Sequence, residues 1–337
     1  MSEASLPGKI AKQYLAKYRN ASTLQIARIL HSEHPLIFWT DEVARGIVRY
    51  YRGAHGKRDR KGLAIDEFIR SQEEAMAQKY NPYGLPDSVN DSWSPIELPF
   101  SKGRGLVIAD LHIPYHDVEA VTIALQWGKK ENYTDFVLID GDLSDHYTIS
   151  RFDKDPRNRS FRQELDSTNQ FFDALEKAFP EAKIIVKYGN HDNRLEAFLR
   201  ARAPELLDME EFIKDKYLKI KERGFISIPH DVPIKVGALS ILHGHEFQTL
   251  TTAVNPARGA YLKALECVLL AHCHRTSQHA ETSLSGRLDT AWSIGCLCHL
   301  HPEYARINKW NHGMAGLEFE GNDFEIENKR IAKGVAR

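Results

Sequence analysis

Five short apolar runs in this chain each end in residues of the kinds that bind metals. The runs are rich in branched side chains and have the length of buried β-strands. In chain order they are 106–109, 136–139, 183–188, 239–242 and 267–271. Loops at strand ends carry functional residues, and five such loops can bring distant residues to one edge of a sheet. The pattern therefore predicts an α/β protein with a composite site at its strand ends.

The residues that follow these runs are carboxylates, one amide and imidazoles. They are Asp110, His112, Asp142, Asn190, His243, His272 and His274. This mixture of oxygen and nitrogen ligands suits divalent metals such as manganese, iron or zinc. Any one of these residues alone would be read as a surface carboxylate or a core histidine. Five groups in order, each at a strand end, predict a metal centre instead.

The motifs read, in order, D-x-H, G-D-x-x-D, G-N-H-D, H-G and H-x-H. This series resembles the motifs of the calcineurin-like metallophosphoesterase superfamily over roughly residues 104–274, and the strand content extends the resemblance to about residue 324. Ala271 stands where the last motif usually has glycine, a change that removes no ligand. The resemblance implies a two-sheet αββα sandwich that hydrolyses phosphate esters.

The same resemblance divides the ligands between two metal ions. One would be held by Asp110, His112, Asp142 and His274, and the other by Asp142, Asn190, His243 and His272. Asp142 would bridge them, because two cations about 3.5–4 Å apart need a shared anion. A hydroxide between the metals is the nucleophile that the resemblance implies. We expect manganese, while iron or zinc would use the same ligands.

Two further residues receive catalytic roles from the resemblance. His191 follows a ligand and would steady the transition state or protonate the leaving oxygen, which contributes roughly 10²–10⁴-fold. Asp145, the second Asp of G-D-x-x-D, would accept a hydrogen bond from His191 and so fix its tautomer. Asp192 we interpret as a turn or supporting residue. The spacing of Cys296 and Cys298 is too tight for a structural zinc site.

Composition is that of an ordinary globular protein. Of its 337 residues, 42% are hydrophobic and 27% are charged, which is typical of folded domains. No apolar run approaches the roughly 18 residues of a membrane span, and four cysteines are too few for a disulfide scaffold. The first residues lack the pattern of a secretory signal. We therefore expect a cytoplasmic protein with no membrane partner.

The N-terminal region is basic and has helical apolar spacing. Residues 1–62 contain 12 Lys and Arg but five Asp and Glu, a net charge of +7. The remainder must carry −8, because the formal net charge of the chain is −1. Helices are predicted over 9–18 and 23–31, and a third after Thr40, a good N-cap. The unit resembles a helix-turn-helix module.

These patterns predict three parts in the chain. A basic helical module would occupy residues 1–79, with a last helix over 63–79. A linker rich in Pro, Ser, Asn and Gly would follow at 80–103, because such residues favour irregular structure. The phosphoesterase domain would occupy 104–330, with strands after residue 291 contributing to the second sheet.

Two groups of basic residues favour nucleic acid as the substrate. The first, on and after the third predicted helix, is Arg45, Arg49, Arg52, Lys57 and Arg58; the second, in the loop after Asp145, includes Arg151, Arg157 and Arg159. Such side chains neutralise backbone phosphates, and arginine binds phosphate with paired hydrogen bonds. Each group has a simpler interpretation: a basic helix that packs on the acidic domain, and an ordinary charged loop.

The motifs also bear on the ester that is cleaved. The phosphoprotein-phosphatase branch has G-D-x-V-D-R-G and G-N-H-E, whereas this chain has His146 after the second Asp, and Asp192 in place of the Glu. This argues against a protein phosphatase of that branch. Our leading hypothesis is a phosphodiesterase or nuclease acting on DNA. The alternatives are a phosphomonoesterase, in which the N-terminal module is a cap or a homodimer contact, and a nucleic-acid-binding regulator with a vestigial metal site.

Overall fold

The computed structural model describes residues 5–18, 21–52, 83, 85–86, 93–151, 160–250 and 253–337. The chain divides into two compact units, Met1–Asp91 and Ser92–Arg337. The helix expected over residues 63–79 and part of the expected linker lie outside the described residues. None of the described helices is long and apolar enough to cross a membrane.

The described residues of the first unit form three helices, which the sequence pattern predicts. They are α1 (Leu6–Lys17), α2 (Thr23–Glu33) and α3 (Asp41–Tyr51). A capping box starts α2, where Ser22 and Gln25 each hydrogen-bond the backbone N–H of the other and so satisfy two amides at the helix start. Thr40 caps α3 by accepting from the backbone N–H of Val43. Buried residues of all three helices, among them Leu30 and Val48, form one small core.

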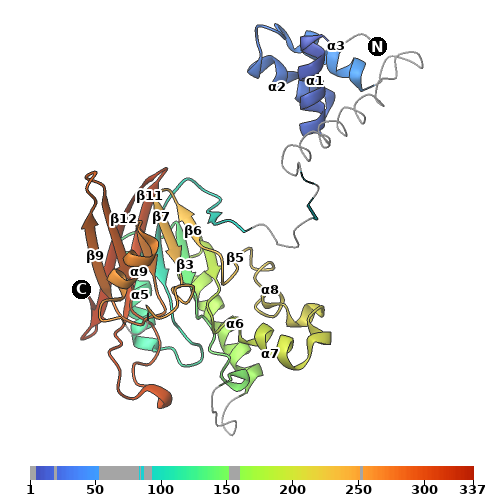
Figure 1. Ribbon diagram of the computed structural model, residues 1–337. Coiled ribbons are helices and arrows are strands. Elements are labelled where there is room, and N and C mark those ends of the chain that lie inside the picture. The colour runs from blue at the N-terminus through green and yellow to red at the C-terminus, as the bar shows by residue number, and fades with distance from the viewer. Residues whose placement is uncertain are drawn as a thin grey trace. The chain divides into compact units, whose positions relative to one another are not determined.

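The second unit is a four-layer αββα sandwich (Figure 1). Its larger sheet has the order β13 (Val335–Ala336), β12 (Asp323–Ala332), β11 (Gly313–Glu320), β2 (Lys102–Ile108), β3 (Phe136–Asp140), β4 (Lys183–Lys187), β5 (Ile226–Ile228). The smaller sheet has the order β1 (Ile96–Glu97), β6 (Ile234–Val236), β7 (Leu239–Leu242), β8 (Val268–Leu270), β10 (Leu288–Ser293), β9 (Ser277–Thr282). The helices are α5 (Val118–Lys130), α6 (Phe161–Ala178), α7 (Arg194–Arg202), α8 (Lys214–Tyr217) and α9 (Pro256–Ala264).

Strand β2 shows why the predicted strands are continuous apolar runs. Leu106 and Ile108 pack against α5 and α6 on one face of the larger sheet. Val107 points to the other face and packs with Ile241 of β7 and Leu269 of β8 in the core between the sheets. Successive side chains of a strand face opposite sides, so a strand covered on both faces has no polar alternation. On the outer face of the smaller sheet, α9 supplies the fourth layer.

Two expectations about the sheets need correction. The five strands that precede the metal-type residues do not belong to one sheet: β2, β3 and β4 lie in the larger sheet, and β7 and β8 in the smaller one. The late strands are also divided. While β10 joins the smaller sheet, β11 and β12 extend the larger one, where β11 pairs antiparallel with β2. Apolar runs identify strands, but they carry no information on which open edge a strand will pair with.

Candidate metal centre

The site forms where strand ends of the two sheets meet. Strands β2, β3 and β4 are parallel, so the loops after them emerge at one end of the larger sheet. The parallel pair β7 and β8 does the same in the smaller sheet. Two hydrogen bonds join the loops: the backbone N–H of His272 donates to Asp110 Oδ2 over 2.9 Å, and His243 Nδ1 lies 2.6 Å from the backbone oxygen of Asp140. The centre is therefore built from loops of both sheets.

Two fully buried carboxylates, Asp110 and Asp142, lie at the middle of the site. Asp142 Oδ2 is 3.2 Å from His243 Nε2 and 3.8 Å from His112 Nε2. Asp110 Oδ1 is 3.2 Å from His274 Nε2, 3.9 Å from His112 Nε2 and 3.8 Å from His243 Nε2. His272, Asp142 and His243 each place one possible ligand atom within 4.8 Å of the others, and we call such a set a potential ligand group. The ring nitrogens of the histidines thus point toward the carboxylate oxygens of Asp110 and Asp142.

The hydrogen bonding of these atoms fits metal coordination. Asp110 Oδ1, Asn190 Oδ1 and His243 Nε2 are buried, and no residue that the structure describes hydrogen-bonds them. Buried polar atoms are nearly always paired, because an unpaired one costs about 1–3 kcal/mol. Ring nitrogens and carboxylate oxygens that converge without hydrogen bonds form a donor set for divalent cations.

The backbone of the ligand loops is strained. Asp110, His112, Asp142, His272 and His274 all have left-handed backbone, with φ between 48° and 62°. A non-glycine residue in this region costs of the order of 1 kcal/mol or more, and such residues cluster at functional sites. This conformation turns each side chain sharply at the strand end. Because of this turn, the first and third residues of D-x-H and of H-x-H point into the site, whereas in a regular strand they would continue along it.

Asn190 is placed by contacts of its neighbours with Asp142. The backbone N–H of His191 donates to Asp142 Oδ1 over 2.8 Å, and Gly189 packs directly on the same residue. Asp192 is buried and supports the loop by accepting from the N–H groups of Gly189 and Ser144. Burial and the nearby Asp142 raise the pKa of Asp192 to about 6. Asp192 contacts backbone amides, as its interpretation as a supporting residue expects.

We expect Gly189→Ala to disrupt the centre. A Cβ at this position would overlap the carboxylate and the backbone nitrogen of Asp142, so the two loops would have to separate. Metal affinity should fall about 10–100-fold, as it does when the residues that support metal ligands are removed. Titration of the metal-free variant with Mn²⁺ measures this. Gly46→Ala, in the helix α3 where a Cβ would meet no atom within 4 Å, is the control, and equal affinity in both variants would contradict the prediction.

Asp145 links two imidazoles of the site. Its Oδ1 lies 2.9 Å from His191 Nδ1 and 3.0 Å from His112 Nδ1. Burial would raise the pKa of the Asp145 carboxyl, but the hydrogen bonds with these two histidines outweigh it and hold the pKa well below its usual range. Asp145 is therefore a carboxylate that orients both rings, so that their Nε2 atoms point toward Asp142.

The family model for calcineurin-like phosphoesterases matches residues 104–289, more than half of the chain. The chain belongs to the calcineurin-like phosphoesterase family. Similar solved structures include Vps29 from Cryptosporidium parvum, which is 14% identical, with 71% of this chain and 96% of that chain covered and a TM-score of 0.37. Another is wild-type Vps29 from Entamoeba histolytica complexed with Zn²⁺, at 12% identity, 69% and 96% coverage, and a TM-score of 0.36. No curated protein matches the chain.

As a member of this family, the protein is a metal-dependent phosphoester hydrolase. Its divalent metals would be held by the converging residues described above, of which Asp110, His112, Asp142, His243, His272 and His274 all offer atoms to the described contacts. The open question for this phosphoesterase is which ester it cleaves.

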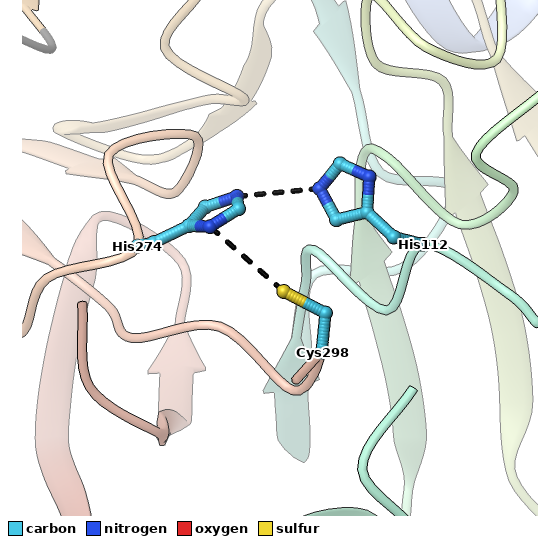
Figure 2. Close-up of side chains that lie close together, drawn as sticks. All are labelled: His112, His274 and Cys298. Carbon is cyan, nitrogen blue, oxygen red and sulfur yellow. Dashed lines mark hydrogen bonds between the residues drawn. The ribbon is translucent and has the colours of Figure 1, made fainter. Parts of the chain in front are cut away.

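Sequence reasoning missed Cys298, which contacts the metal-ligand candidate His274. Figure 2 shows dashed lines from the His274 ring to His112 and to Cys298. Its Nε2 lies 3.2 Å from His112 Nε2, and its Nδ1 lies 3.8 Å from Cys298 Sγ. Cys298 therefore forms a potential ligand group with His112 and His274, in which one ligand atom from each lies within 4.8 Å of the others. The spacing of the two nearby cysteines bears only on whether they share a zinc ion, and it does not show that Cys298 would meet His274.

Sequence reasoning also missed Arg194, the first residue of α7. Its guanidinium donates to the backbone oxygen of Asp145 over 2.6 Å and lies 3.0 Å from His191 Nε2. The only signal in the sequence is its position directly after G-N-H-D-N, which places an arginine one helical turn from the predicted catalytic histidine.

The basic residues predicted to bind substrate are only partly described. Arg157, Arg159, Lys57 and Arg58 lie outside the described residues, and Arg151 lies at the boundary of the loop after Asp145. On α3, Arg49 is exposed, and the Arg45 side chain is 41% exposed with Glu42 3.5 Å away. The Arg52 guanidinium bonds Thr23 Oγ1 and the backbone oxygen of Ala21. It joins α3 to the start of α2.

Proposed function

We propose that this phosphoesterase is a dinuclear, manganese-dependent phosphodiesterase that cleaves DNA. The observation that carries the dinuclear part is the position of Asp142. This carboxylate belongs to one potential ligand group with His112 and His191 and to another with His243 and His272. A carboxylate shared by two groups of imidazoles is the bridging ligand that a two-metal site needs.

The chain's own residues supply positioning and proton handling. Metals bound at this centre supply stabilisation of the charged phosphoryl oxygens and a water of lowered pKa. Asp145 accepts from the Nδ1–H of His191, so Nε2 is the nitrogen that faces the ligands, 3.9 Å from Asp142 Oδ2. From this position His191 Nε2, once protonated, can give a proton to the leaving oxygen. Burial of Asp110, Asp142 and His243 keeps the field of the ligands from being screened by solvent.

The N-terminal unit supports DNA as the substrate. Its α2 and α3 are joined by the segment 34–40, and α3 presents the exposed Arg49 and the half-exposed Arg45. A helix with basic residues on its exposed face is the usual element that binds nucleic acid in helix-turn-helix modules. The intact ligand set supports an enzyme over a regulator with a vestigial site.

The first test compares bis-p-nitrophenyl phosphate with p-nitrophenyl phosphate in Mn²⁺, alongside labelled single- and double-stranded DNA. Preference for the diester together with cleavage of DNA is the expected result. Preference for the monoester with intact DNA would overturn the DNase proposal and support a phosphomonoesterase whose N-terminal unit has another role, such as a cap or a dimer contact.

The double variant Arg45→Gln/Arg49→Gln tests the role of α3. We expect DNA binding to weaken uniformly across sequences and the slope of log K against log salt to fall by about one for each phosphate that the variant no longer neutralises. Hydrolysis of bis-p-nitrophenyl phosphate should be unchanged. Fluorescence anisotropy at several salt concentrations measures the slope. Arg200→Gln, which removes an exposed charge from α7, is the matched control, and an equal slope in both proteins would exclude α3 from the interface.

A further inference from the structure

Arg194 is a cationic side chain at the catalytic histidine, and the proposed chemistry has not yet given it a role. The side chain is 18% exposed. One nitrogen donates to the backbone oxygen of Asp145, and the other lies 3.0 Å from His191 Nε2. The Asp145 carboxylate is 3.7 Å from the guanidinium and also serves the Nδ1 atoms of two histidines. The arginine therefore shares its nearest negative charge with two other partners.

The contact between Arg194 and His191 has only one chemically allowed direction. A guanidinium has no acceptor and stays protonated in proteins, so Arg194 must donate and His191 Nε2 must accept. The Nδ1–H of His191 then donates to Asp145. In this state the Nε2 lone pair, which faces the ligands 3.9 Å from Asp142 Oδ2, is occupied by the arginine.

A phosphate ester that reaches the ligands must come close to this same nitrogen. An anionic oxygen is a far better acceptor for a guanidinium than a neutral imidazole, because charge-assisted hydrogen bonds are roughly twice as strong as neutral ones. Arg194 has five N–H donors, and its described contacts leave donors for a second, parallel bond to phosphate. Transfer of the guanidinium from His191 Nε2 to the phosphate would free the Nε2 lone pair from this hydrogen bond.

We propose that Arg194 binds the non-bridging oxygens of the scissile phosphate and leaves His191 Nε2 when the substrate enters. It is then a substrate-binding residue supplied by the start of α7. Position 146, directly after Asp145, cannot supply this charge, because His146 is buried with Nδ1 3.0 Å from the backbone oxygen of His191, and burial lowers its pKa to about 4. The inference rests on the proposed hydrolysis of phosphate diesters.

The test measures binding of inorganic phosphate to the full-length, Mn²⁺-loaded protein, together with hydrolysis of bis-p-nitrophenyl phosphate. In Arg194→Met we expect phosphate affinity to fall at least about tenfold and kcat/KM to fall about 10²–10³-fold, the range for the loss of one group that stabilises a transition-state oxyanion. Arg200→Met, on the exposed side of the same helix, should match the wild type in both measurements.

A purely structural role for Arg194 predicts a different result. Because the guanidinium also holds the backbone of Asp145, such a role would lower metal content or Tm and leave the phosphate affinity of the loaded protein unchanged, which would overturn the proposal. If Arg194→Met fails to retain metal, the phosphate affinity of Arg194→Lys distinguishes the two roles. This variant keeps the charge and loses the paired hydrogen bonds. A tenfold weaker phosphate affinity in that variant supports the proposal, and wild-type affinity overturns it.

The phosphate titration also separates this inference from the proposed function. If the wild-type protein hydrolyses neither test ester, the proposed function fails. Binding of inorganic phosphate that depends on Arg194 would still support the anion site, whereas binding that is independent of Arg194 would reject it.

Discussion

Asp142→Asn is expected to abolish hydrolysis, with kcat on bis-p-nitrophenyl phosphate at least about 10³-fold lower. Asp142 is fully buried, its Oδ2 lies 3.2 Å from His243 Nε2, and it belongs to two potential ligand groups. An amide keeps the size of the side chain but removes the negative charge that two metals would share. The loss of several kcal/mol of transition-state stabilisation corresponds to a rate effect of this size.

Steady-state kinetics and metal analysis of the purified variant measure the effect. Asp166→Asn is the control, because Asp166 is an exposed residue of α6 whose partner is Arg162 one turn away. Only the Asp142 variant should lose metal as well as activity. If Asp142→Asn retained near wild-type turnover, the carboxylate would not be a bridging ligand. If neither protein turned over any ester and DNA binding was intact in both, a regulator with a vestigial site would be favoured.

Removal of metal is expected to lower the Tm of the second unit by about 10 °C. The centre joins loops of both sheets, and Asp110 and Asp142 are fully buried in it. A ligand that binds only the folded state stabilises it by about 4 kcal/mol at a thousand times its Kd. Each kcal/mol shifts Tm by about 2–4 °C in a domain of 150–250 residues. Buried carboxylates that lose their cations also repel each other.

Differential scanning calorimetry with Mn²⁺ and with EDTA measures this shift. Asp142→Asn should respond less to EDTA than the wild type, since it has less bound metal to lose. Re-addition of Mn²⁺ after EDTA should restore the original Tm. A wild-type Tm that is the same with and without chelator would mean that metal binding is not coupled to the folded sandwich, contrary to the geometry of the loops.

The parts of the fold that could be predicted are those set by local chemistry. The run Phe136–Ile139 is a strand because both faces of β3 are covered, which removes polar alternation. Thr40 begins α3 because its hydroxyl satisfies an amide at the helix start. The motif residues at strand ends were found for the same reason: a strand can be recognised from a few residues, and the polar residues after it lie at its end.

The remaining features depend on contacts between segments that are far apart in the sequence. Nothing within the run 239–242 shows that β7 lies in a different sheet from β3. Arg52 has the same helical pattern as Arg49, yet it bonds the start of α2 because the turn brings Thr23 within reach. Likewise, Arg194 looks like an ordinary first-turn residue until the loop after β3 places Asp145 beside it.

The left-handed backbone of the metal loops limits how this centre can be transplanted. Asp110, His112, Asp142, His272 and His274 converge in a backbone conformation with positive φ at each of them. A design that placed the same motif residues on loops without these positive φ angles would not direct their side chains toward a common centre. A protein engineer who wished to graft the centre would need to transfer the backbone angles with the residues, and to choose a host stable enough to carry their cost.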